Sequence, residues 1–180
     1  MALISGDFSS NSPYWERKKV NLHLMKLKKP LLVVVATFAV IFLLIQLFPI
    51  SLPANIQPNP SDIVLNGQAN IEVGKILRTS CYDCHSNEVR YPWYSQIAPI
   101  SWLVAHDVEE GREELNFSIW MEYDEKRMIR KLEEIAEEVE DGEMPLGVYS
   151  SIHSQASIDA AELEILKSWT RELRQTLVGN

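Results

Sequence analysis

The sequence predicts an all-α protein, in which one N-terminal transmembrane helix precedes a globular domain of about four helices. Three observations support this prediction. A continuous apolar run covers residues 31–48. Later segments repeat apolar residues at steps of three and four, as the buried face of a helix requires. No segment shows the alternation and turn signals of a strand or a hairpin.

The apolar run has the length and composition of a membrane anchor. It contains no charged side chain, and Thr37 and Gln46 are its only polar ones. As a helix that includes Pro49 and Ile50, it would reach about 30 Å, the thickness of a bilayer core. We therefore predict a transmembrane anchor over residues 31–50. A cleaved signal peptide is the alternative, although the run is long for one and no small-x-small cleavage site follows.

Basic residues flank this run on one side only. Six Lys or Arg residues precede it, and the next one along the chain is Lys75. The positive-inside rule then places residues 1–30 in the cytoplasm and the chain after Pro49 across the membrane. For a bacterial protein, this predicts a single pass through the inner membrane with the main domain in the periplasm.

The segments next to the anchor differ from it in composition. Residues 1–24 are polar and lack apolar periodicity, whereas Met25 opens a basic stretch typical of the start of a membrane-targeted protein. We expect residues 1–24 to be a disordered cytoplasmic tail or an extension from a misplaced start codon. Residues 51–62 contain three prolines and are predicted to be a Pro-rich linker that reaches roughly 40 Å. The exported domain then covers residues 63–180.

Charge divides the chain at the same place. Residues 1–50 hold six Lys or Arg and two Asp or Glu, a net charge of +4, whereas residues 51–180 hold eleven and twenty-three, a net charge of −12. A strongly acidic exported domain argues against binding to nucleic acid or to anionic lipid. It is compatible with a basic redox partner, although solubility explains it equally well.

Four segments of the exported domain have a helical pattern. Their apolar residues recur at helical spacing over residues 68–80, 101–110, 124–141 and 157–176. Ser101, Asp124 and Ser157 are the predicted N-caps, and Gly111 and Gly142 the predicted stops. The segment between the first two helices, residues 86–100, is rich in proline and aromatic residues and is predicted to be a loop.

The two cysteines of the chain fall in one short motif. Cys81 and Cys84 are three residues apart, and His85 follows at once. Cys-x-x-Cys-His is the attachment signal for c-type haem. Two thiols one helical turn apart can add to the two vinyl groups of haem, and the adjacent imidazole can bind the iron. We therefore predict one covalently bound haem c per chain, with His85 as an axial ligand of the iron.

A second axial ligand must come from a distant part of the chain, and Met144 is the best candidate. It follows the predicted stop at Gly142 and precedes Pro145, which disfavours helix at the residue before it. Its thioether could then project at the open face of the iron. The other candidates are His106, His153, Met121 and Met128. Both of these methionines are expected to lie in the core.

Two further groups of residues could contribute to such a site. Aromatic side chains could line a haem crevice or form an ordinary core, and they are Trp93, Tyr94, Trp102, Trp120 and Trp169. Acidic side chains before Met144 could dock a basic partner or simply form a solvated helix face, and they are Glu133, Glu134, Glu137, Glu138 and Glu140.

Four stretches of the sequence are similar to a known family. CYDCHSN, YPWYSQIAPISWLVAHDVEEGREELNFSIW, DGEMPLGVYSSIH and ELEILKSW resemble the small haem-binding domain family of bacterial exported proteins. The resemblance covers roughly residues 60–175. It implies a membrane-anchored or periplasmic, cytochrome c-like monohaem domain. It also implies that Cys81 and Cys84 carry the haem, with His85 as the proximal ligand and Met144 as the distal one.

These observations predict an electron carrier with no catalytic residues rather than an enzyme. Iron bound by both His85 and Met144 has no vacant position for a substrate, so it would exchange single electrons with redox partners that the sequence does not identify. One alternative is a haem-based sensor or peroxidase-like enzyme with an open iron site. The other is a haem-free protein that uses the motif as a redox thiol pair or as a zinc site. The chain lacks the βαβ pattern of a thioredoxin-like thiol protein, and it lacks the second cysteine pair of a structural zinc site.

Overall fold

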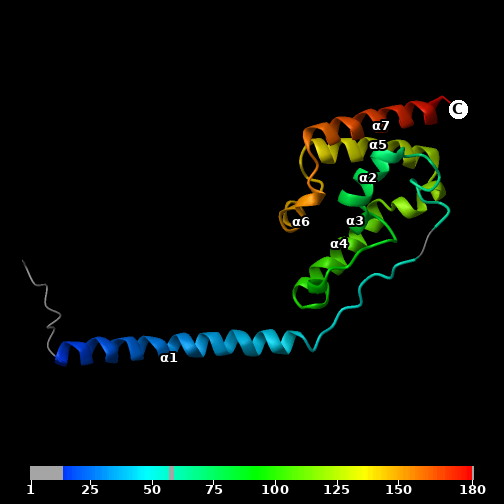
Figure 1. Cartoon of the computed structure of the whole chain (residues 1–180). Coiled ribbons are helices and arrows are strands. Elements are labelled where there is room, and N and C mark those ends of the chain that lie inside the picture. Colours follow the sequence, from blue (N-terminus) through cyan, green and yellow to red (C-terminus); the bar gives the residue numbers. More distant parts are fainter. Residues whose placement is uncertain (1–13, 57–58, 180) are drawn as a thin grey trace, which may run out of the picture. The chain divides into compact units, whose positions relative to one another are not determined.

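The structure, a computed structural model, describes residues 14–56 and 59–179, and for residues 14–28 it describes the backbone alone. These residues form seven α-helices and three short 3-10 helices and no strand (Figure 1), which confirms the all-α prediction. The structure has more helices than the sequence predicts, because several short elements have no clear apolar pattern. The chain divides after Phe48 into two compact units.

The first unit is the helix α1, Tyr14–Ile45. Most of its apolar side chains from Leu31 to Leu44 are exposed. The helix ends five residues before the predicted boundary at Ile50, and a turn follows it. No helix in the described part of the chain is both long enough and apolar enough to cross a membrane.

The predicted cytoplasmic tail falls only partly within the described residues. Residues 1–13 lie outside the described residues, so the expectation of disorder there stays a prediction. From Tyr14 onward the backbone is helical, which contradicts a disordered tail for residues 14–24.

The second unit begins at Pro49 and holds the remaining elements. Its α-helices are α2 Ile71–Ser80, α3 Tyr82–His85, α4 Ile100–Glu114, α5 Glu125–Glu140, α6 Gly147–Ile152 and α7 Ala160–Val178. Its 3-10 helices are η1 Trp93–Gln96, η2 Phe117–Glu122 and η3 Ser154–Ala156. Helices α5 and α7 lie side by side, and α2, α3 and α4 follow one another on one side of this pair (Figure 1).

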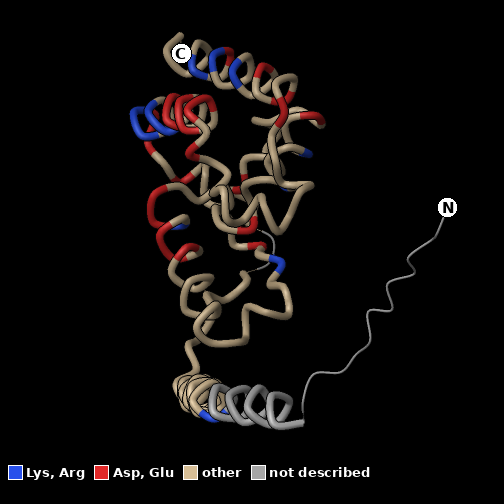
Figure 2. Tube along the Cα trace, turned by 90° about the vertical axis from the view of Figure 1, so that its left-hand side faces the viewer, with Lys and Arg blue, Asp and Glu red and all other residues tan. Residues whose placement is uncertain are grey.

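One hydrophobic core joins five of these elements. Its buried members come from α2, α3, η2, α5 and α7, and they include Val73, Leu77, Tyr82, Phe117, Trp120, Leu132, Leu166 and Trp169. Most charged residues lie outside this core, and the buried exceptions are Asp62 and Lys131. Figure 2 shows charged residues along α5, α7 and the C-terminal half of α4, whereas residues 91–105, which include η1 and the start of α4, contain none.

Helix α5 follows its predicted limits most closely. The Asp124 carboxylate accepts a hydrogen bond from the Arg127 N–H at 2.8 Å, so it is the predicted N-cap. Gly142 follows the helix with φ of +76°, a conformation that favours glycine. At α7 the predicted cap is wrong, because Asp159 rather than Ser157 forms the cap, in a capping box with Glu162.

Gly111 does not end a helix, as the sequence had suggested. Helix α4 continues through it to Glu114. A Cβ at this position would lie 2.9 Å from the Cys84 carbonyl oxygen, closer than real Cβ atoms come to other atoms. The glycine therefore lets α4 approach α3 closely, and this is a packing requirement that a sequence pattern does not distinguish from a helix stop.

The segment predicted to be a linker lies within the second unit and packs in part against the rest of it. The Pro53 carbonyl accepts a hydrogen bond from the Tyr91 hydroxyl at 2.7 Å. The Asn55 side chain accepts from the Val89 N–H at 2.9 Å and donates to the Val89 carbonyl at 2.7 Å. We call residues 53–56 the strap. These bonds hold the strap on the domain, so the chain free to extend ends near residue 52 rather than residue 62.

Candidate functional site

The Cys-x-x-Cys-His motif begins at the junction between α2 and α3. Cys81 lies between the two helices, and its carbonyl accepts hydrogen bonds from the Cys84 and His85 N–H groups at 3.1 and 2.9 Å. Both cysteines are free and partly exposed. Burial of the sulfur atoms raises the pKa of Cys81 to about 12 and that of Cys84 to about 11. The thiols are therefore protonated at neutral pH.

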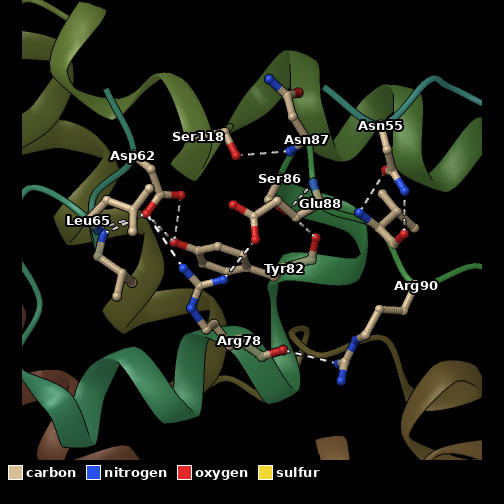
Figure 3. Close-up of polar contacts among 12 residues, drawn as sticks. Asn55, Asp62, Leu65, Arg78, Tyr82, Ser86, Asn87, Glu88, Arg90 and Ser118 are labelled. Carbon is tan, nitrogen blue, oxygen red and sulfur yellow. Dashed lines mark hydrogen bonds and ion pairs between the residues drawn. The ribbon is translucent and has the colours of Figure 1, made fainter. Parts of the chain in front are cut away.

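A buried tyrosine within the motif, Tyr82, connects it to the core. The Tyr82 ring stacks on Phe117 with centroids 5.5 Å apart, and its hydroxyl donates to the fully buried Asp62 carboxylate at 2.9 Å. The same carboxylate accepts from the Val64 and Leu65 N–H groups at 2.9 and 3.0 Å. Figure 3 shows the Asp62 carboxylate with Tyr82 and Leu65, and these contacts join the start of the domain to the motif.

Further polar contacts surround the tyrosine. The Arg78 guanidinium lies 4.8 Å from the Tyr82 ring centroid and 2.8 Å from the Glu88 carboxylate (Figure 3). Ser86, directly after the motif, donates through its hydroxyl to the Tyr82 carbonyl at 2.8 Å and accepts from the Glu88 N–H at 2.9 Å. Burial and the neighbouring Asp62 both raise the pKa of Tyr82. These contacts hold helix α3 in place through Tyr82 and Ser86.

The imidazole of His85 is oriented by the backbone of α4. Its Nδ1 lies 2.8 Å from the Gly111 carbonyl oxygen and 3.1 Å from the Leu115 carbonyl oxygen. Carbonyl oxygens only accept hydrogen bonds, so Nδ1 carries the proton and Nε2 keeps a free lone pair. Burial lowers the pKa of His85 and favours this neutral form. The histidine is therefore prepared to bind a metal through Nε2.

All four predicted site residues line one two-part hollow. A cavity of about 450 Å³ is lined by Cys81, and a second cavity of about 260 Å³ is lined by Cys84. The two cavities share five lining residues, Ser80, His85, Glu114, Met144 and Pro145. The fold thus brings Met144 to the same hollow as the motif, although 59 residues separate it from His85. We call this two-part space the hollow.

Met144 reaches the hollow from the loop between α5 and α6. The Met144 and Glu143 N–H groups both donate to the Glu138 carbonyl at 3.0 Å. These bonds fold the chain back over the last turn of α5, and the Met144 side chain remains half-buried. A thioether at this place can donate a lone pair to a metal held by His85.

The competing ligands do not line the hollow. His106 is exposed on α4, with its Nε2 3.4 Å from the Glu110 carboxylate. His153 contacts the Tyr94 hydroxyl and stacks on Tyr149 at 4.5 Å between ring centroids. Met128 belongs to the core, as expected. Met121 does not, because 44% of it is exposed.

Several residues that line the hollow were missed by the sequence analysis. Lys131 is only 7% exposed, and its Nζ lies 2.6 Å from the Glu134 carboxylate and 3.3 Å from that of Glu114. The sequence does contain a signal that Lys131 is buried. It lies one helical turn from both Met128 and Ile135, and so on the edge of the apolar stripe. The aromatic walls are Phe117 and Tyr149.

The aromatic and acidic groups divide between the core, the hollow and the surface. Trp120 and Trp169 are core residues, whereas Trp93 is 78% exposed. The acidic residues of α5 do not form one solvated face. Glu134 and Glu138 line the larger cavity, and two others are paired with α7, where Glu133 meets Arg174 at 3.1 Å and Glu140 meets Lys167 at 2.6 Å.

The donor set of the hollow is unusual for a simple metal ion. Within the part of the chain that the structure describes, no group of three His, Cys, Asp or Glu side chains is placed to hold one. The hollow instead combines one imidazole nitrogen, one thioether and two free thiols in a largely apolar wall. This combination suits a flat, apolar group that brings its own metal.

Comparison with known proteins gives the same result. A family model described as a haem-binding domain matches residues 40–172, well over half of the chain. No curated protein and no solved structure matches significantly. The matched region contains the motif, the strap and the loop that carries Met144. The chain therefore belongs to the haem-binding domain family.

Proposed function

We propose that the protein is a monohaem c-type cytochrome that transfers single electrons between redox partners. In this proposal Cys81 and Cys84 attach the haem covalently, and His85 and Met144 are the axial ligands of its iron. One observation carries the proposal. The two thiols, the imidazole with a free Nε2 and the thioether all line the same hollow.

The residues of the hollow fit a haem. The thiols lie on neighbouring cavities that share His85, so one flat group could meet both sulfur atoms and the imidazole together. Apolar side chains suited to a porphyrin face line the larger cavity, and they are Leu115, Phe117, Ile135, Val139 and Ile158.

Haem, when bound, supplies an iron that exchanges one electron without transfer of atoms. The residues set how easily this happens. The Gly111 and Leu115 carbonyls hold the His85 ring in one orientation and increase the basicity of Nε2. The Met144 thioether favours the ferrous state, and the apolar wall penalises the additional charge of the ferric one. With both ligands in place, no iron position is open to a substrate.

The membrane anchor and the location of the domain belong to the same proposal. Residues 31–50 carry no charge and follow a basic segment, which favours insertion with the N-terminus in the cytoplasm. The haem domain would then lie in the periplasm, where c-type haem is attached. An anchored carrier meets donors and acceptors in the same membrane at a raised effective concentration.

The intact mass of the protein, purified from cells that mature c-type haem, tests the proposal. We expect a mass increase equal to one haem, which is lost in the Cys81→Ala, Cys84→Ala double variant. The reduced wild-type protein should not bind carbon monoxide, since both axial positions are filled. An unmodified mass would disprove covalent haem and leave the thiol or zinc alternative. Ready carbon monoxide binding would favour a sensor or peroxidase-like enzyme.

A further inference from the structure

One end of the second unit differs from the rest in charge. The unit as a whole carries a net charge of −12, but residues 91–105 contain no Asp, Glu, Lys or Arg. Figure 2 shows that the loop around η1 and the first turns of α4 lie apart from the charged helices α5 and α7. We call residues 92–103 the tip.

The tip exposes large apolar side chains. Trp93 is 78% exposed, Leu103 50%, Ile100 45% and Trp102 36%. An apolar group of this size on an acidic domain indicates a surface that contacts something other than water. Tryptophan in particular is enriched at membrane interfaces, because its ring is apolar and its N–H can still bond to water or lipid head groups.

The exposure of the tip is not caused by a loose loop. The Ser95 and Ile97 N–H groups donate to the Pro92 and Tyr94 carbonyls at 3.0 Å, and the Ser101 N–H donates to the Ile97 carbonyl at 2.9 Å. Ser95, Ala98 and Ser101 are buried beneath the exposed residues. The fold therefore presents Trp93, Ile100, Trp102 and Leu103 on a fixed support.

The chain enters the domain beside the tip. The Tyr91 hydroxyl, next to the first residue of the tip, donates to the Pro53 carbonyl of the strap at 2.7 Å. Only five residues lead from Phe48, the last residue of the first unit, to Pro53. A fully extended chain of that length reaches about 18 Å. The proposed anchor ends at Ile50, closer still to Pro53, so the base of the tip would lie near the surface of the membrane.

We propose that the tip is a lipid-contacting surface, in which Trp93, Ile100, Trp102 and Leu103 enter the interfacial layer of the bilayer that holds the anchor. This inference rests on the membrane anchor of the proposed function. Charge favours lipid contact through this end, because the acidic faces of α4, α5 and α7 would be repelled by anionic lipid whereas the tip is neutral. The contact would fix the orientation of the haem domain on the membrane and so decide which of its faces meets a redox partner.

Photo-crosslinking to lipid tests this inference in the full-length haem protein, reconstituted into phosphatidylcholine vesicles. The crosslinker p-benzoylphenylalanine replaces Trp93, or Leu103, or as a matched control Ile71, which is 95% exposed on α2. After illumination, we expect a lipid adduct in the intact mass at position 93 and at position 103, several-fold above that at position 71. Adding Trp93→Glu to the position 103 variant should reduce its adduct, because a charge in the interfacial layer is costly.

Two further readouts separate failure of the inference from failure of the anchor. Unchanged haem absorbance shows that each variant is folded, and flotation with the vesicles after an alkaline wash shows that the anchor is inserted. If the protein floats but gives equal adducts at positions 93 and 71, the inference that the tip contacts lipid is wrong and the anchor is unaffected. An adduct to a second protein chain in place of lipid would overturn the inference too, and assign the tip to a protein partner. If the protein does not float, both the proposed membrane anchor and the lipid contact of the tip are wrong.

Discussion

The two sides of the hollow are built in different ways. His85 is half-buried in a short helix that the buried, hydrogen-bonded Tyr82 and Ser86 hold in place, and two carbonyls of α4 fix its ring. Met144 is half-buried in a loop, held by backbone hydrogen bonds to the Glu138 carbonyl. The helix that follows it, α6, has no buried residue.

This difference teaches where the site is rigid and where it can move. Segments with few buried apolar contacts open at a lower free energy than the core does. The His85 side should therefore keep its geometry with or without haem, whereas the Met144 side should depend on the bond to iron that we propose. Mutations on the His85 side are expected to change the stability of the whole unit, and mutations of Met144 to change mainly the iron site.

The largest expected effect on stability comes from Asp62→Ala. This change leaves the buried Tyr82 hydroxyl and the Val64 and Leu65 N–H groups without their acceptor, which should lower the free energy of unfolding by about 3 kcal/mol. Asp159→Ala is the matched control, since it removes an exposed cap and should cost only about 1 kcal/mol. Urea denaturation compares the two. Equal losses would mean that the Asp62 network does not stabilise the His85 side.

Gly111→Ala should have an intermediate effect. The added Cβ would lie 2.9 Å from the Cys84 carbonyl oxygen, so α4 must move away from α3, at a cost of about 2 kcal/mol. The same shift should weaken the hydrogen bond that orients His85. Gly147→Ala is the control, because a Cβ there meets no atom within 4 Å. Thermal unfolding measures both variants, and a neutral Gly111→Ala would contradict the close contact between α3 and α4.

Tyr82→Phe should have a smaller effect, one that depends on pH. Burial raises the pKa of Tyr82 in the folded protein above the value of about 10 that it has in the unfolded chain. Above pH 10 the unfolded state loses this proton first, so the wild type should lose stability relative to the variant by about 1.4 kcal/mol per pH unit. Urea denaturation at pH 9 and pH 11 tests the sign. If the difference in free energy of unfolding between the wild type and Tyr82→Phe is the same at both pH values, the hydroxyl is not shielded from water.

The sequence was sufficient where the deciding contacts are local. Helix α5 was predicted with its Asp124 cap, since both the apolar stripe and the cap lie within one segment. The all-α class and haem binding followed from the helical patterns and from Cys81, Cys84 and His85. In each case the residues that carry the information are neighbours along the chain, or one helical turn apart.

The sequence was insufficient where distant contacts decide. Gly111 was read as a helix stop because its real constraint, the Cys84 carbonyl, lies in another helix. The strap was read as a free linker because its partners, Val89 and Tyr91, follow more than thirty residues later. Lys131 was missed because its two carboxylate partners and the hollow are brought together only on folding.

Ligation by His85 and Met144 together is the central claim, and ferric absorption spectroscopy of Met144→Ala tests it most directly. Met121→Ala is the control, since Met121 is exposed and does not line the hollow. We expect the sulfur-to-iron charge-transfer band in the wild type and in Met121→Ala. In Met144→Ala the band should disappear, and the reduced protein should gain carbon monoxide binding while its stability changes little. A band that persists in Met144→Ala would contradict the assignment of Met144 as the second ligand.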